Sequence, residues 1–214
     1  MSNQVKRILM TVLGVSVCGF SVGFFSYSDF GMDPFQVLAH GLWNLTPISF
    51  GLFYIILNAI MLVVIFFTNK RKIGLGTVIN LFLIGYISEF SEFLLRNFQQ
   101  EPTMLVRIVA LTIAVIVMCF ASAIYFTADL GVSTYDAIAL TIDERTSDKI
   151  QFRFIRIATD LICVIVGVIF GAKAGVGTII TAFFMGPLIA FFNRTVAIPM
   201  LYGKNGNPNS QKTE

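Results

Sequence analysis

Six long apolar runs constrain what this chain can fold into. Each has about the 20 residues that a helix needs to cross the hydrocarbon core of a bilayer, where backbone polar groups must bond within the protein. Only 13% of the 214 residues are charged, against roughly 25% in an ordinary soluble domain. The sequence therefore predicts an all-α polytopic membrane protein. The expected transmembrane helices are Ile8–Tyr27, Phe50–Thr68, Gly74–Leu95, Ile108–Ala128, Phe152–Ala172 and Ala174–Asn193.

The basic residues predict the orientation of these spans. If the N-terminus is cytoplasmic, twelve of the 15 Lys and Arg residues fall on the cytoplasmic side. The other three are Arg96, Arg107 and Lys173. Because cytoplasmic loops carry an excess of Lys and Arg, we expect both termini in the cytoplasm. The first apolar run follows a basic segment but has no signal-peptide cleavage site, so we expect an uncleaved helix.

The second half of the chain repeats the first. YSDFGMDPFQVLAHGL aligns with FTADLGVSTYDAIALTI, so that Asp29 and Gly31 correspond to Asp129 and Gly131 at an offset of 100 residues. KIGLGTV likewise recurs as KAGVGTI. Each half holds three spans, and an odd number reverses the second half, as in transporters built from inverted repeats. We expect repeats over residues 1–100 and 101–200, and a disordered cytoplasmic tail over 201–214.

A short helix is predicted after the first span of each half. Asp33 is an N-cap residue followed by proline, and Ser133 with Asp136 forms a pattern like a capping box. Gly31 and Gly131 permit the bends that precede these helices. Two interpretations are open. The helices lie at the membrane interface, or they are re-entrant and their positive N-terminal ends help to hold a polar or anionic solute.

Polar residues inside the predicted spans are candidate substrate ligands. Asp160 lies well inside the fifth span, where an unpaired carboxylate is costly, and Arg156 one turn earlier can reach it. This pair is either structural or part of a binding site. Asn58 is the repeat equivalent of Asp160, and such positions approach the axis where transporter sites lie. Asn80 and Thr181 are further candidates, one turn inside the third and sixth spans.

The third and sixth spans both begin with the pattern Gly-x-Gly-Thr. Small residues there allow close helix packing. Alternatively, free N–H groups and the threonine hydroxyl form a polar nest for a ligand. The residues concerned are Gly74, Gly76, Thr77, Gly175, Gly177 and Thr178.

With the duplicated D-x-G turn and the duplicated K-x-G-x-G-T motif, the chain resembles the YczE/YitT-like group of bacterial integral membrane proteins. The resemblance runs from about Ile8 to Asn193. That group carries G-x-x-P-F-D after the first span; here Gly31 and the Pro-Phe pair match, while Gln36 replaces the acid, which reappears as Asp136. The resemblance implies a protein of the bacterial inner membrane and names no substrate.

Several functional classes are disfavoured by the sequence. The chain has one histidine and no HExxH, CxxC, nucleophile-elbow or Walker pattern, so we expect no enzyme, cofactor or metal site. The three cysteines lie in apolar runs, where a thiol is a small buried hydrophobe. A net charge of +3 does not suggest a nucleic-acid partner.

We expect a secondary transporter or exporter of a small polar or anionic solute. Two alternatives stay open: a membrane-embedded accessory or regulatory protein that stabilises a partner, and the substrate-capturing membrane subunit of an ATP-driven uptake system. The expected partner is the lipid bilayer, with a homo-oligomer or another membrane protein also open.

Overall fold

The computed structural model describes residues 3–69, 73–146 and 152–203, and within these ranges the regular structure is helical. The helices are α1 (Asn3–Ser28), α2 (Pro34–Trp43), α3 (Phe50–Asn69), α4 (Leu75–Phe98), α5 (Met104–Ala128), α6 (Thr134–Thr146), α7 (Phe152–Ile169), α8 (Val176–Phe192), the π-helical segment η2 (Asn193–Ala197) and α9 (Ile198–Tyr202). The predicted all-α membrane fold is confirmed at this level.

Five helical stretches in the described residues are long and apolar enough to cross a membrane: α1, α3, α4, α5 and the continuous run Val176–Tyr202. The fifth predicted span, in α7, contributes the shorter apolar helix Ile157–Ile169. The expected boundary between residues 100 and 101 falls in the connection from α4 to α5. The tail was expected from residue 201, but α9 continues to Tyr202 because Leu201 is buried. Residues 204–214 lie outside the described residues.

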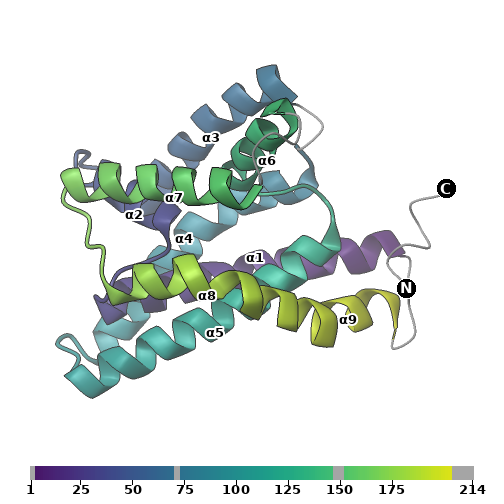
Figure 1. The fold of residues 1–214 in the computed structure, drawn as a ribbon. Helices are drawn as coiled ribbons and strands as arrows, with labels where there is room; N and C mark the ends of the chain where they lie inside the picture. The colour runs from purple at the N-terminus through teal and green to yellow at the C-terminus, as the bar shows by residue number, and fades with distance from the viewer. Residues whose placement is uncertain (1–2, 70–72, 147–151, 204–214) are drawn as a thin grey trace.

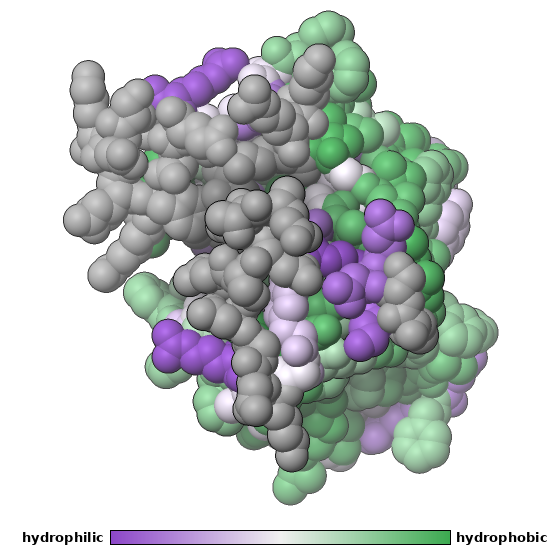
Figure 2. All heavy atoms as spheres, turned by 90° about the vertical axis from the view of Figure 1, so that its right-hand side faces the viewer, coloured by the Kyte–Doolittle hydropathy of each residue, from purple (hydrophilic) through white to green (hydrophobic). Residues whose placement is uncertain are grey.

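The bundle has two ends. Arg7, near the start of α1, donates to the carbonyl of Ala128 (3.0 Å) and to the Tyr202 hydroxyl (3.2 Å), and we call this the terminal end. At the opposite end, Tyr27 donates to the carbonyl of Gln99 (3.0 Å). Figure 1 shows the long helices running between these ends, with α1 beside α5 and α2 beside α7. Figure 2 looks onto the terminal end, where hydrophobic side chains cover much of the described surface and lie beside patches of polar ones.

Small residues let α1 approach its two main neighbours. A Cβ at Gly14 would lie 2.9 Å from the backbone nitrogen of Tyr125 in α5, and one at Gly23 would lie 2.5 Å from Ser91 in α4. Ser21 donates to the carbonyl of Ala114 (2.7 Å), across the same contact with α5. Close backbone approach and interhelical hydrogen bonds of this kind hold membrane helices together, because lipid supplies no hydrophobic drive between them.

Two tight turns connect the long helices to the short ones, and each turn contacts the other half of the chain. Asp29 and Gly31 have positive φ of 58° and 96°, and Asp129 and Gly131 have 52° and 109°. The carbonyl of Phe30 in the first turn accepts from the backbone N–H of Gly177 at the start of α8 (2.8 Å).

The second turn makes the equivalent contact with the first half. The carbonyl of Leu130 accepts from the backbone N–H of Gly76 at the start of α4 (2.7 Å). A Cβ at Gly31 would lie 2.5 Å from the nitrogen of Gly175, and one at Gly131 would lie 2.7 Å from that of Gly74. Glycine is therefore required in both turns, by its conformation and by the space available.

The glycine turns lead to a stability prediction. Gly31→Ala and Gly131→Ala should each destabilise the protein by at least about 1–2 kcal/mol, the cost of a left-handed non-glycine residue, with steric overlap adding to it. The measurement is the melting temperature of purified protein in detergent. Gly186→Ala is the control and should lower the melting temperature less, because Gly186 has no positive φ and, apart from its chain neighbours, nothing lies within 4 Å of a Cβ there. Equal melting temperatures for the three variants would contradict the role of the turns.

Candidate functional site

The two short helices meet where they begin. The ring of Phe35, in the first turn of α2, stacks on the ring of Tyr135, in the first turn of α6, with centroids 5.1 Å apart and planes 14° from parallel. These two residues occupy equivalent positions in the sequence repeat. The segments singled out by their sequence similarity therefore pack against each other through matching aromatic residues.

Side chains cap both short helices. The Oδ1 atom of Asp33 accepts from the backbone N–H of Gln36 (3.3 Å), so the predicted N-cap of α2 is confirmed. At α6, Ser133 Oγ accepts from the N–H of Asp136 (3.1 Å) and donates to the Asp136 carboxylate (2.6 Å). In a capping box, the Asp136 side chain would accept from the backbone N–H of Ser133. Here it accepts from the Ser133 hydroxyl instead.

Helix α2 is enclosed by the protein. Seven of its residues are buried: Pro34, Phe35, Gln36, Val37, Ala39, His40 and Gly41. It crosses α7 so closely that a Cβ at Gly41 would lie 2.4 Å from the carbonyl oxygen of Gly167. An interfacial helix would leave its apolar face to the lipid. Because the apolar Phe35 is buried here, the structure favours the re-entrant interpretation.

Asn58 and Asp160 both support the start of α6. Asn58 donates through Nδ2 to the carbonyl of Tyr54 (2.8 Å), and its Oδ1 accepts from the Thr134 hydroxyl. The Asp160 carboxylate accepts from the hydroxyl of Tyr135. Both bonds go to adjacent residues of α6, one from α3 and one from α7. The predicted partner of Asp160, Arg156, has a side chain that lies outside the described residues.

A set of polar groups surrounds the middle of α1. The carboxylates of Asp33 and Asp136 both interact electrostatically with Cys18, which lies near the midpoint of that helix. Asp33 also interacts with Tyr54, and Asp136 with Tyr125. The acids at the starts of α2 and α6, one from each half, therefore both lie near enough to Cys18 for their charge to act on it.

Two atoms of this region have no hydrogen-bond partner among the described residues: Gln36 Oε1 and the Tyr125 hydroxyl, both on residues only 4% exposed. Unpaired polar atoms in a buried place are costly and are rare in native structures. We call the following residues the central site: Cys18, Asp33, Gln36, Tyr54, Tyr125 and Asp136.

The sequence analysis missed four members of the central site: Cys18, which it treated as a small buried hydrophobe, Gln36, Tyr54 and Tyr125. Gln36 offered a signal, since it replaces the acid of the family pattern while Asp136 keeps the acid in the second copy. The two tyrosines offered none, because an aromatic residue in an apolar run is normal packing.

The predicted polar nests at the starts of α4 and α8 bind the protein itself. The backbone N–H groups of Gly76 and Gly177 are bonded to the turns described above. Thr77 Oγ1 accepts from the N–H of Gly74 (3.2 Å) and donates to the carbonyl of Val132 (2.7 Å). These groups hold the turn of the other half, so their geometry favours the packing interpretation.

The start of α8 also bonds within the protein, and the two deeper candidates, Asn80 and Thr181, are buried. Thr178 Oγ1 accepts from the N–H of Gly175 (3.3 Å), and Thr181 donates to the carbonyl of Thr178 (2.9 Å). Asn80 and Thr181 therefore occupy packed positions in α4 and α8.

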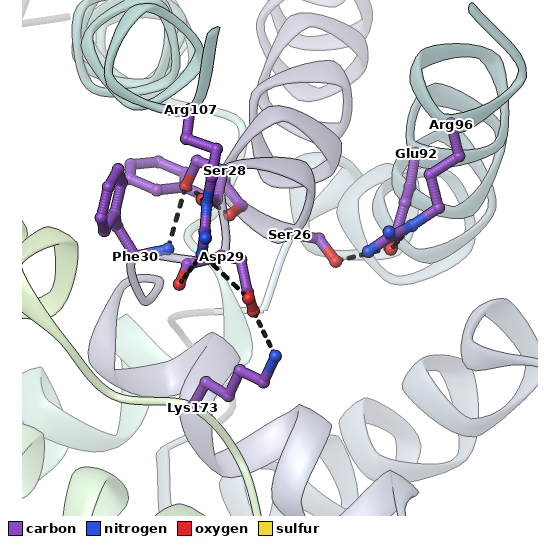
Figure 3. Close-up of polar contacts among 9 residues, drawn as sticks. Ser26, Ser28, Asp29, Phe30, Glu92, Arg96, Arg107 and Lys173 are labelled. Carbon is purple, nitrogen blue, oxygen red and sulfur yellow. Dashed lines mark hydrogen bonds and ion pairs between the residues drawn. The ribbon is translucent and has the colours of Figure 1, made fainter. Parts of the chain in front are cut away.

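The aspartates of the two turns form ion pairs at the two ends. Asp29 lies between Arg107 (2.9 Å) and Lys173 (2.6 Å), as Figure 3 shows. Asp129, at the terminal end, lies 3.8 Å from Arg7. Arg107 also donates to the carbonyl of Ser28 (2.8 Å). The first turn is thus anchored by charge as well as by its backbone bonds.

Comparisons with known proteins agree with the family resemblance. The model of a family of unknown function, DUF6198, matches residues 5–194. An uncharacterized protein of Haemophilus influenzae is 26% identical over 196 residues, which cover 91% of this chain and 86% of that protein. The uncharacterized membrane protein YczE of Bacillus subtilis is 24% identical over 161 residues, 75% of this chain and 73% of YczE.

A further relative is the uncharacterized protein YyaS of Bacillus subtilis, 23% identical over 181 residues, with 84% of this chain and 89% of YyaS covered. No solved structure matches the chain. The resemblance to the YczE-like group is therefore confirmed.

The bond between Tyr135 and Asp160 leads to a double-variant prediction. Asp160→Leu should leave the Tyr135 hydroxyl without this acceptor and destabilise the protein by about 1–3 kcal/mol. Tyr135→Phe should remove the hydroxyl, so the double variant should be less unstable than the sum of the single effects. The measurement is the unfolding free energy in detergent. Tyr86→Phe, at a half-exposed tyrosine, is the control and should add independently to Asp160→Leu. Additivity for Tyr135→Phe would contradict the contact.

Proposed function

We propose that this chain, which belongs to the DUF6198 family of unknown function, is a secondary transporter or exporter of a small solute in the bacterial inner membrane. Its six spans form two inverted halves, and the solute binds between the starts of α2 and α6. The observation that carries the proposal is the reciprocal contact of each turn with the opposite half.

The reciprocal contacts support a two-fold relation. Phe30 bonds to Gly177, and its repeat equivalent Leu130 bonds to Gly76. The same contact is thus made twice, with the two halves of the chain exchanged. A two-fold axis between the halves produces such paired contacts. The first turn lies at the opposite end and the second at the terminal end. An axis that exchanges these ends lies in the membrane plane, as in inverted repeats.

The direction of α7 supports a sixth span. Asn44, at the end of α2, donates through Nδ2 to the carbonyl of Phe170, directly after α7 (3.2 Å). Lys173 follows and pairs with Asp29 at the opposite end. The run Val176–Tyr202 then returns to the terminal end, where Tyr202 meets Arg7. The end of α7 therefore lies at the opposite end and the next run returns from there, which supports α7 as the sixth span.

The position of the central site near the midpoint of α1 supports solute binding there. Substrate sites in inverted-repeat transporters lie near the bilayer midplane, at the repeat interface, and involve the ends of broken helices. Here two short helices begin against each other through Phe35 and Tyr135. Both N-termini already carry a side-chain cap, so Gln36 Oε1 and the Tyr125 hydroxyl are the groups that offer new hydrogen bonds to a polar solute.

Topology can be tested with reporter fusions after Asn69 and after Asn97. The first should report the cytoplasm and the second the periplasm, because Gly76, at the start of α4, bonds to the turn at the terminal end, whereas Gln99, after α4, bonds to Tyr27 at the opposite end. A fusion after Tyr202 should report the cytoplasm, as Lys and Arg favour that side. The same location for Asn69 and Asn97 would exclude the six-span inverted arrangement.

Transport can be tested in proteoliposomes by solid-supported-membrane electrophysiology and counterflow, with a panel of organic acids, amines and sugars. For a solute that gives flux, Gln36→Leu and Tyr125→Phe should each lower the initial rate about five- to tenfold, the effect of one lost hydrogen bond. Tyr86→Phe is the matched control and should keep the wild-type rate. The absence of flux across the whole panel from folded protein would favour an accessory protein or an uptake subunit.

A further inference from the structure

A second polar cavity opens at the opposite end of the bundle. Its volume is about 310 Å³, at the lower end of the range for small-ligand pockets. The ends of α1, α2 and α4 and the loop between α7 and α8 surround it, and all of these segments belong to the described residues. The lining residues used below are Phe25, Asp29, Met32, His40, Trp43, Arg96 and Lys173.

His40 lines this pocket and carries a buried polar atom without a hydrogen bond to any described residue. The residue is 9% exposed, and its Nε2 atom has no hydrogen-bond partner among the described residues. Its ring stacks on Phe50 (4.2 Å between centroids) and meets Trp43 edge-on (5.8 Å), so its position is fixed by packing. Burial lowers the pKa of His40 to about 4, which keeps the imidazole neutral near pH 7.

Basic side chains outnumber acidic ones in the pocket lining. Asp29 is shared by Lys173 and Arg107, and Glu92 is paired with Arg96 (2.8 Å). Of these residues, Arg96, Lys173 and Asp29 line the pocket, so its lining holds two cations and one carboxylate. The Lys173 side chain is 71% exposed, so a solute can reach it directly from the solvent. A concave site of net positive charge raises the local concentration of anions.

Apolar groups form the remaining wall. Phe25 and Met32 are buried at the end of α1 and in the following turn, and Trp43 is half-buried at the end of α2. Trp43 is itself held by a hydrogen bond from Nε1 to the carbonyl of Ile48 (2.7 Å). The pocket therefore combines a positive rim, an apolar wall and a fixed polar atom, the combination that selects an amphipathic ligand.

We propose that this pocket binds a small organic anion, whose acidic group is attracted by Lys173 and Arg96 and accepts a hydrogen bond from His40 Nε2 while its apolar body lies against Trp43. The pocket is separate from the central site, and the inference concerns binding alone. It therefore stands whether or not the protein transports a solute.

Trp43 makes the test specific, because it is the only tryptophan of the chain and it lines the pocket. Purified full-length protein in lipid-free nonionic detergent is titrated with cyclohexanecarboxylate, cyclohexanecarboxamide and cyclohexylmethylammonium, which share a ring and differ in charge. The carboxylate should change the tryptophan fluorescence saturably and bind most tightly, and the ammonium should bind most weakly. Equal binding of the three probes, tighter binding of the ammonium or a carboxylate signal that does not saturate would overturn the proposal.

Three variants assign the contacts. Lys173→Gln and Arg96→Gln should each weaken carboxylate binding about two- to fivefold, the range for exposed charges, and His40→Phe about two- to tenfold, the range for one hydrogen bond. Arg194→Gln removes an exposed charge in η2 and should change nothing. Unchanged binding in all three pocket variants, each with wild-type melting behaviour, would overturn the proposal. So would tighter binding of a short-chain phosphatidylglycerol than of the carboxylate, since the pocket would then hold a lipid headgroup.

Discussion

Buried backbone N–H and C=O groups are costly without a hydrogen bond, so each irregular stretch that the bundle encloses must find its partners within the protein. Tight turns follow α1 and α5, and their carbonyl groups need donors. Two helices begin after Gly74 and Gly175, and their first N–H groups need acceptors. The structure solves both needs with one arrangement. The turn carbonyls of Phe30 and Leu130 accept from the free N–H groups of α8 and α4. Each half therefore completes the backbone bonding of the other.

The positions of the short helices depend on these contacts. Once the turns are held, α2 and α6 begin against each other, and Phe35 and Tyr135 stack. Asn58 and Asp160 then supply acceptors for hydroxyl groups at the start of α6. The same arrangement that satisfies the backbone thus brings polar groups from both halves to the middle of α1. It also leaves the end of α2 facing the loop after α7, where the pocket lined by Trp43 and Lys173 forms.

The sequence predicted the elements better than it predicted their partners. The D-x-G turns, the Asp33 cap and the glycine-rich helix starts were all recognisable, because each depends on local conformational preferences. That the turns and the helix starts bind each other was not predicted, since both motifs are also explained by local structure alone. Tyr125 and His40 show the same limit: their unpaired atoms exist only because distant helices exclude water around them.

By itself, the sequence determined the helical membrane class, the approximate limits of the helices and the correspondence between the halves. These follow from the length of apolar runs, from turn residues and from spacing, all of which act over a few residues. Only the tertiary structure decided that α2 is enclosed, that Asp160 bonds to Tyr135, and that Gly31 lies against Gly175. Each of these contacts joins residues far apart in the chain, and its geometry arises from the close packing of several helices at once, which no local pattern records.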